Sequence, residues 1–94
     1  MASHPIMMHD NGPRPAHQPA NPGDTITWTN KASTAQDLTY PACVSNGGSI
    51  ANIPKDGSVM QTVNNGATTG PYTYSYKDHT KKKRMPQNGT IDVS

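Results

Sequence analysis

The chain has 94 residues, a length that suits a single domain, and its formal net charge at neutral pH is only +2. Leucine, glutamate and arginine are scarce, whereas threonine, asparagine, glycine and proline are abundant; this composition argues against a helical fold and favours a small all-β domain. No run of about 18 apolar residues indicates a membrane span. No phosphate-binding glycine loop, Ser–His–Asp pattern or Cys–His pair indicates an enzyme.

The first part of the chain, residues 1–22, holds five of the nine prolines and a single β-branched residue, Ile6. Because proline cannot donate a hydrogen bond to a sheet ladder, this part does not fit a regular central strand. We expect one domain over residues 1–94, with residues 1–14 as a loose N-terminal strand or arm.

The clearest predicted strand covers residues 25–29, where Ile26 and Trp28 face one side and the threonines face the other. Trp28 is the largest apolar group of the chain, and we expect it in the core. Turn signals recur about every ten residues, which is typical of a β-sandwich. Between them, shorter alternations predict strands at 37–40, 50–53, 59–63, 72–76 and 90–93.

Two separated segments carry a family resemblance. Residues 22–30 follow Pro15-Ala16 after a short spacer, and residues 70–79 are followed by Met85 and by residues 89–93. In this order and at this spacing, the segments resemble the small cupredoxins of the plastocyanin, pseudoazurin and amicyanin kind. The resemblance implies a Greek-key β-sandwich of cupredoxin type with seven or eight strands, copper binding, electron transfer and a periplasmic or extracellular location.

A cupredoxin holds copper with two histidine nitrogens, one cysteine thiolate and a distant axial methionine. Position by position, the resemblance places the first histidine at Gln36, the cysteine at Tyr76, the second histidine at His79 and the axial ligand at Met85. Two of the four ligands are therefore replaced, including the thiolate, and a type 1 copper site is not expected. A glutamine oxygen and a phenol could still hold Cu(II) weakly together with His79.

The sequence thus indicates a cupredoxin-like copper-binding domain without the type 1 cysteine and one histidine, with weak Cu(II) binding or a protein-interaction role. The alternative is a working electron-transfer copper protein with an unusual ligand set. No enzymatic activity is expected under either interpretation, and we expect a monomer.

Three further features, the single cysteine, a run of cations and the tyrosines near residue 74, each have a structural interpretation and a functional one. Cys43, the only thiol, is interpreted as a small, partly buried apolar residue, with an intermolecular disulfide or metal binding as alternatives. The four cations from Lys81 to Arg84 favour an acidic protein partner, or simply keep a loop soluble. Nucleic-acid binding is not expected unless the tyrosines at 72, 74 and 76 form an exposed stacking platform.

The N-terminal segment combines imidazole and thioether groups, donors that suit copper in either oxidation state. If Met1 is removed, Ala2-Ser3-His4 also has the spacing of a square-planar Cu(II) site. Such clusters near chain ends are often accidental, and both readings stay open. The residues concerned are His4, Met7, Met8, His9 and His17.

Overall fold

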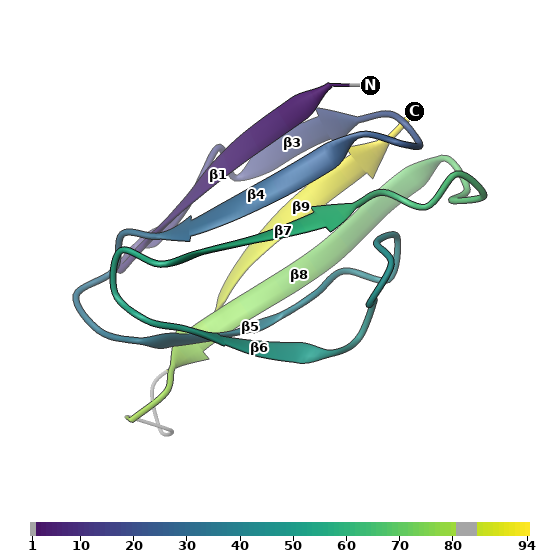
Figure 1. Ribbon diagram of the computed structural model, residues 1–94. Coiled ribbons are helices and arrows are strands. Elements are labelled where there is room, and N and C mark those ends of the chain that lie inside the picture. The colour runs from purple at the N-terminus through teal and green to yellow at the C-terminus, as the bar shows by residue number, and fades with distance from the viewer. Residues whose placement is uncertain (1, 81–84) are drawn as a thin grey trace.

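The computed structural model describes residues 2–80 and 85–94, which form two β-sheets packed face to face (Figure 1). The strands are β1 (Ser3–His9), β2 (Gly12–Arg14), β3 (His17–Ala20), β4 (Thr25–Asn30), β5 (Gln36–Thr39), β6 (Ile50–Ile53), β7 (Ser58–Thr62), β8 (Gly70–Asp78) and β9 (Gln87–Val93). Within these described ranges, no helix has the length and apolar character that a membrane crossing requires. The all-β sandwich predicted from the sequence is confirmed.

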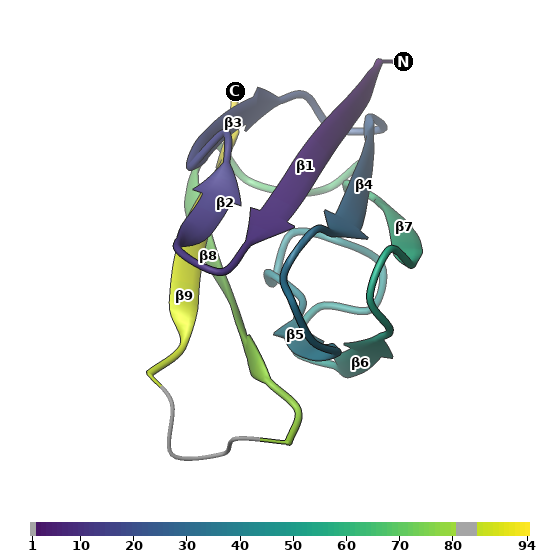
Figure 2. The same ribbon diagram turned by 90° about the vertical axis from the view of Figure 1, so that its left-hand side faces the viewer.

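The two sheets have the strand orders β2-β1-β4-β7 and β3-β9-β8-β5-β6. Neighbouring strands are antiparallel, except that β1 runs parallel to β4 and β3 runs parallel to β9. Both chain termini lie at one end of the sandwich, here termed the terminal end (residues 2–4 and 18–25), as Figures 1 and 2 show. The opposite end, termed the β8–β9 end, holds residues 34–36, 76–80 and 85–87.

One of the two inner strands of the first sheet, β4, follows the predicted alternation closely. Ile26 and Trp28 are fully buried, whereas the three threonines that alternate with them are half-buried on the outer face. The turn before this strand contains Gly23 with φ of +90°, a left-handed conformation that glycine adopts without steric cost. The sequence pattern and the turn therefore fix which side of β4 enters the core.

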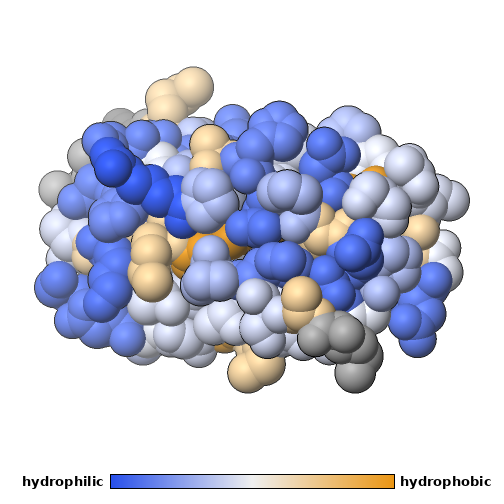
Figure 3. All heavy atoms as spheres, turned by 90° about the horizontal axis from the view of Figure 1, so that it is seen from above, coloured by the Kyte–Doolittle hydropathy of each residue, from blue (hydrophilic) through white to orange (hydrophobic). Residues whose placement is uncertain are grey.

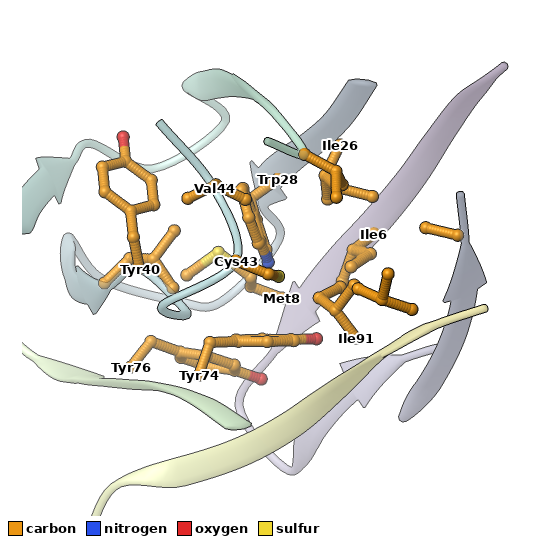
Figure 4. Packing of buried hydrophobic residues seen from close by; sticks show 14 of the residues in the cluster. Ile6, Met8, Ile26, Trp28, Tyr40, Cys43, Val44, Tyr74, Tyr76 and Ile91 are labelled. Carbon is orange, nitrogen blue, oxygen red and sulfur yellow. The ribbon is translucent and has the colours of Figure 1, made fainter. Parts of the chain in front are cut away.

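Aromatic side chains from both sheets fill the core, as Figure 4 shows. Trp28 has no exposed surface, which confirms its predicted position. Its ring centroid lies 5.5 Å from that of Tyr74 and 5.6 Å from that of Tyr40, distances at which aromatic pairs stabilise a core beyond their area burial. Tyr74 and Tyr76 point inward from β8 toward Trp28 and Met8. Tyrosines thus supply the bulk that a chain with one leucine and no phenylalanine otherwise lacks.

The N-terminal segment corrects one expectation. Residues 3–9 form a regular strand, β1, that lies between β2 and β4, and Ile6 and Met8 are fully buried. Only Met7 and Met8 are paired on both sides, because the ladder with β2 covers Met7 to His9 and the ladder with β4 covers Ser3 to Met8. Pro5 therefore lies where β1 has β4 as its only ladder neighbour, so the missing N–H of proline does not prevent the strand.

Candidate functional site

A small cavity lies at the β8–β9 end, where the sequence places the four candidate ligands. Its volume is about 10 Å³, and Gln36, Tyr76 and Met85 are among the residues that line it. This volume corresponds to roughly one water molecule. His79 does not line the cavity. The fold therefore brings three of the four residues together and directs the fourth elsewhere.

Tyr76 closes the cavity from the core side. Its side chain is 1% exposed, and its hydroxyl donates a hydrogen bond of 2.7 Å to the backbone carbonyl of His9 at the end of β1. Burial raises the pKa of this phenol, and the neighbouring Tyr74 and Asp10 raise it further. The phenol thus stays protonated at neutral pH and links the second sheet to the first.

Gln36 is also buried and takes part in a hydrogen-bond network. Its side-chain amide nitrogen lies 3.3 Å from the hydroxyl of Thr34, and that hydroxyl donates a 2.6 Å hydrogen bond to Asp78. Thr80 donates both its backbone N–H and its hydroxyl to the other oxygen of the same carboxylate. Asp78 is 2% exposed and lies opposite Gln36 in the β5–β8 register. These bonds tie β8 to the segment before β5.

His79 lies on the other side of the sheet. Its Nδ1 atom is 2.9 Å and 3.0 Å from the two carboxylate oxygens of Asp37, and its side chain is 52% exposed. Asp37 alternates with the inward-facing Gln36 on β5 and so faces outward. Burial opposes ionisation of Asp37, but hydrogen bonds from Asn52 and His79 outweigh that effect and lower its pKa. The imidazole is thus oriented by a carboxylate, away from the cavity.

The two sulfur groups that could serve a copper ion are also separated. Met85 lines the cavity but is 80% exposed, so its thioether is not held in the interior. Cys43 lies in the core and is 2% exposed. It comes after the C-terminal end of β5, whereas Gln36 begins that strand, and it does not line the cavity. Its burial raises the pKa of the thiol, so the thiolate that binds copper is disfavoured.

As placed, these donors do not fit a type 1 copper ion. That site needs two imidazole nitrogens and a thiolate around one metal. Here the cavity has a bonded phenol and an amide, while the Nδ1 atom of His79 is bound to Asp37 on the other face of β5. Across residues 2–80 and 85–94, no group of three or more His, Cys, Asp or Glu side chains is arranged to hold a metal.

The other sequence features are dispersed in the structure. His4 points inward to Asp24, with 2.8 Å between Nε2 and the carboxylate, whereas Met8 is buried in the core. The N-terminal imidazole and thioether groups therefore form no single cluster. The predicted docking run from Lys81 to Arg84 lies outside the described residues. Tyr74 and Tyr76 are buried, so the β8 tyrosines form no exposed stacking platform.

Comparison with known proteins supports the fold. No family model matches the chain, and no curated protein sequence matches it. Solved amicyanin structures do match: a Cu(I) form of a variant with methionine replaced by alanine gives a TM-score of 0.67 at 16% identity, covering 98% of this chain and 82% of that one. A reduced variant with proline replaced by phenylalanine gives a TM-score of 0.68 at the same identity and coverage. The chain therefore has a cupredoxin-like fold, as its sequence predicts.

Sequence reasoning missed three residues of the site: Thr34, Asp37 and Asp78. The pattern Asp78-His79-Thr80 is an Asx-type turn signal, so the bonds from Thr80 to Asp78 could have been predicted. The bond from Thr34 to Asp78 spans 44 positions and leaves no local signal. The same holds for the contact between Asp37 and His79, which spans 42 positions.

Proposed function

We propose that this chain is a cupredoxin-type domain that works without a type 1 copper centre, as a protein-interaction module that binds Cu(II) only weakly. The observation that carries the proposal is the 2.7 Å hydrogen bond from the Tyr76 hydroxyl to the His9 carbonyl. It holds a neutral phenol at the position where the resemblance expects the thiolate.

Recruiting Tyr76 as a ligand would be costly for two reasons. A phenol binds Cu(II) as a phenolate, and burial raises the pKa of this group. Binding would also break the bond to His9 and leave a carbonyl without its donor, a loss of about 1–3 kcal/mol for a buried group. Both terms favour a structural role for Tyr76.

Weak Cu(II) binding is assigned to His79 in this proposal. Metal-binding imidazoles commonly use one ring nitrogen for the metal while the other donates to a carboxylate. With Nδ1 held by Asp37, His79 would offer Nε2 from a half-exposed ring. Gln36 and Tyr76 would contribute only if the cavity opened, and Met85 is exposed at a cavity that His79 does not line. A single strong donor therefore remains, and the affinity should be low.

Titration with Cu(II), followed by electron paramagnetic resonance, tests this function. We expect a colourless complex with a large copper hyperfine splitting, which His79→Ala removes and the control His17→Ala leaves in place. An intense visible band at about 600 nm, where copper thiolates absorb, would instead support the electron-transfer alternative.

A periplasmic or extracellular location and a monomeric state belong to the same proposal. The support for the location is the cupredoxin-like fold, and the support for the monomer is the concentration of positive charge described below. Sedimentation of the purified protein should give the mass of one chain at all concentrations, and cell fractionation should recover the native protein outside the cytosol.

A further inference from the structure

A groove lies on the outer face of the second sheet, on the opposite side of β5 and β8 from the small cavity. Its volume is about 340 Å³. The floor is formed by Asp37 and Thr39 of β5 with Ser75 and Lys77 of β8. Ile50 of β6 and Pro86, just before β9, add apolar surface to its lining.

The groove combines apolar surface with one available cation. The Ile50 side chain is 69% exposed, a high value for a large apolar residue. Lys77 lies directly opposite Asp37 in the ladder, but that carboxylate accepts hydrogen bonds from His79 and Asn52. Across the described residues, no ion pair within 4.0 Å engages the Lys77 ammonium. The Lys77 charge contributes to lowering the pKa of Asp37, but without a close ion pair its ammonium can still contact an anionic group on a ligand.

The positive charge of the chain is concentrated in the sequence between two residues of the groove lining, Lys77 and Pro86. Five of the eight Lys and Arg residues fall between Lys77 and Arg84 in the sequence, together with only one of the six aspartates. The rest of the chain carries three cations and five carboxylates, so it is net negative. Such an asymmetry attracts acidic partners and opposes contact with a second copy of the same surface.

We propose that this groove binds an extended acidic segment of a partner protein, with a carboxylate of the segment beside Lys77 and an apolar side chain between Ile50 and Pro86. The assignment rests on the proposed interaction function and gives that function a location and a partner class. Nucleic acid fits less well, because Tyr74 and Tyr76 of β8, which could stack on bases if they were exposed, are buried.

The face of the molecule seen in Figure 3 shows no comparably large apolar surface. That face is mostly hydrophilic, and apolar colour occurs there only in small separate spots. Met60, the other strongly exposed apolar residue on a strand, lies on β7 in the first sheet and lines neither the cavity nor the groove. Apolar surface and a lysine without a close ion pair among the described residues therefore coincide in the groove.

The test uses a short peptide of alternating glutamate and valine, titrated into the 15N-labelled protein and followed by amide chemical shifts. We expect the shifts to centre on Asp37, Thr39, Ile50, Ser75 and Lys77, and to weaken as salt is added. Lys77→Glu should weaken binding by about fivefold or more, and Ile50→Ser by a similar factor. Lys55→Glu, an exposed change in the β6–β7 turn, is the matched control and should reduce affinity far less.

A control peptide with glutamine in place of glutamate separates charge from shape. If it binds as tightly as the acidic peptide, or if the shifts lie outside the groove, the assignment is wrong. Stronger binding of a single-stranded oligonucleotide at the same residues, or self-association through them, would also overturn it. If the Cu(II) titration gives a colourless protein but the acidic peptide causes no chemical-shift changes in the groove, only this inference is contradicted. A copper–thiolate band in the Cu(II) titration would contradict the proposed function itself.

Discussion

The two ends of the sandwich are each closed by a buried aspartate, but the two carboxylates are held by different groups. At the terminal end, Asp24 is 4% exposed and accepts backbone N–H bonds from Ala2 and Asn21. The Nε2–H of His4 donates to it as well, and the Nδ1 atom of the same ring is 3.2 Å from the amide nitrogen of Gln18. This network joins β1, β3 and the turn before β4.

At the β8–β9 end, Asp78 is held by threonine side chains and one backbone N–H. Tyr76 and Gln36 fill the space beside it and leave a cavity of only about 10 Å³. Hydrogen bonds within the protein therefore occupy the end where the sequence resemblance places the four metal ligands. Both ends are closed by internal hydrogen bonds, and the groove proposed to bind a partner lies instead on the outer face of the second sheet.

Trp28→Ala should have the largest effect and should weaken both ends alike, because the indole lies in the core between them. Loss of a buried aromatic side chain typically costs about 3–5 kcal/mol in the free energy of unfolding. Urea unfolding monitored by circular dichroism measures this. A cost below about 1 kcal/mol would mean that the indole contributes little to the core.

Asp78→Ala should affect the β8–β9 end selectively. It leaves the donors of Thr34 and Thr80 without their acceptor, and we expect a loss of about 1–3 kcal/mol. Amide hydrogen exchange should increase near β5 and β8 while the terminal end stays protected. Asp92→Ala, on the outer face of β9, is the control and should change little. Equal loosening of both ends would mean that they are not independent.

Tyr76→Phe and Tyr74→Phe form a matched pair that isolates one hydrogen bond. Removing the Tyr76 hydroxyl, which donates to His9, should cost about 1 kcal/mol in unfolding free energy. The Tyr74 hydroxyl is buried and has no hydrogen bond of good geometry among the described residues. Burial raises its pKa to about 12, against a smaller opposing effect of the neighbouring Trp28. Removal of the Tyr74 hydroxyl should be neutral or stabilising. Urea midpoints compare the two variants, and equal costs would contradict the assigned link between the sheets.

Acid should destabilise the terminal end through Asp24. Hydrogen bonds from Ala2 and Asn21, and then from His4, hold the pKa of Asp24 far below its usual value. A depressed carboxyl pKa stabilises the fold above the unfolded-state value of about 3.9, and this contribution is lost as the pH falls below it. The urea midpoint of Asp24→Asn should therefore fall less between neutral pH and pH about 3 than that of the wild type. Asp56→Asn, an exposed turn residue, should keep the wild-type slope.

Much of the fold could be predicted from local patterns, because β4, and β9 from Gly89 on, alternate between buried and half-buried residues. Across the described part of the chain, the structure has nine strands instead of the expected seven or eight. Local alternation does not predict the short strands β2 and β3, since proline and glycine interrupt it and pairing with β1 and β9 imposes these strands. The inward positions of Gln36 and Tyr76 follow from strand parity. The direction of His79 does not, because Asp37 lies 42 positions away and sets it only in the folded chain.

The central claim is that two replaced residues prevent a type 1 copper site. The most direct test is the visible spectrum with Cu(II) of a double variant, Gln36→His with Tyr76→Cys, recorded beside that of the wild type. Both substituted positions line the small cavity, and a complete donor set also requires that His79 leave Asp37. We expect a colourless wild type and a double variant with an intense band near about 600 nm. A wild type with that band, or a double variant that binds Cu(II) without it, would contradict the account.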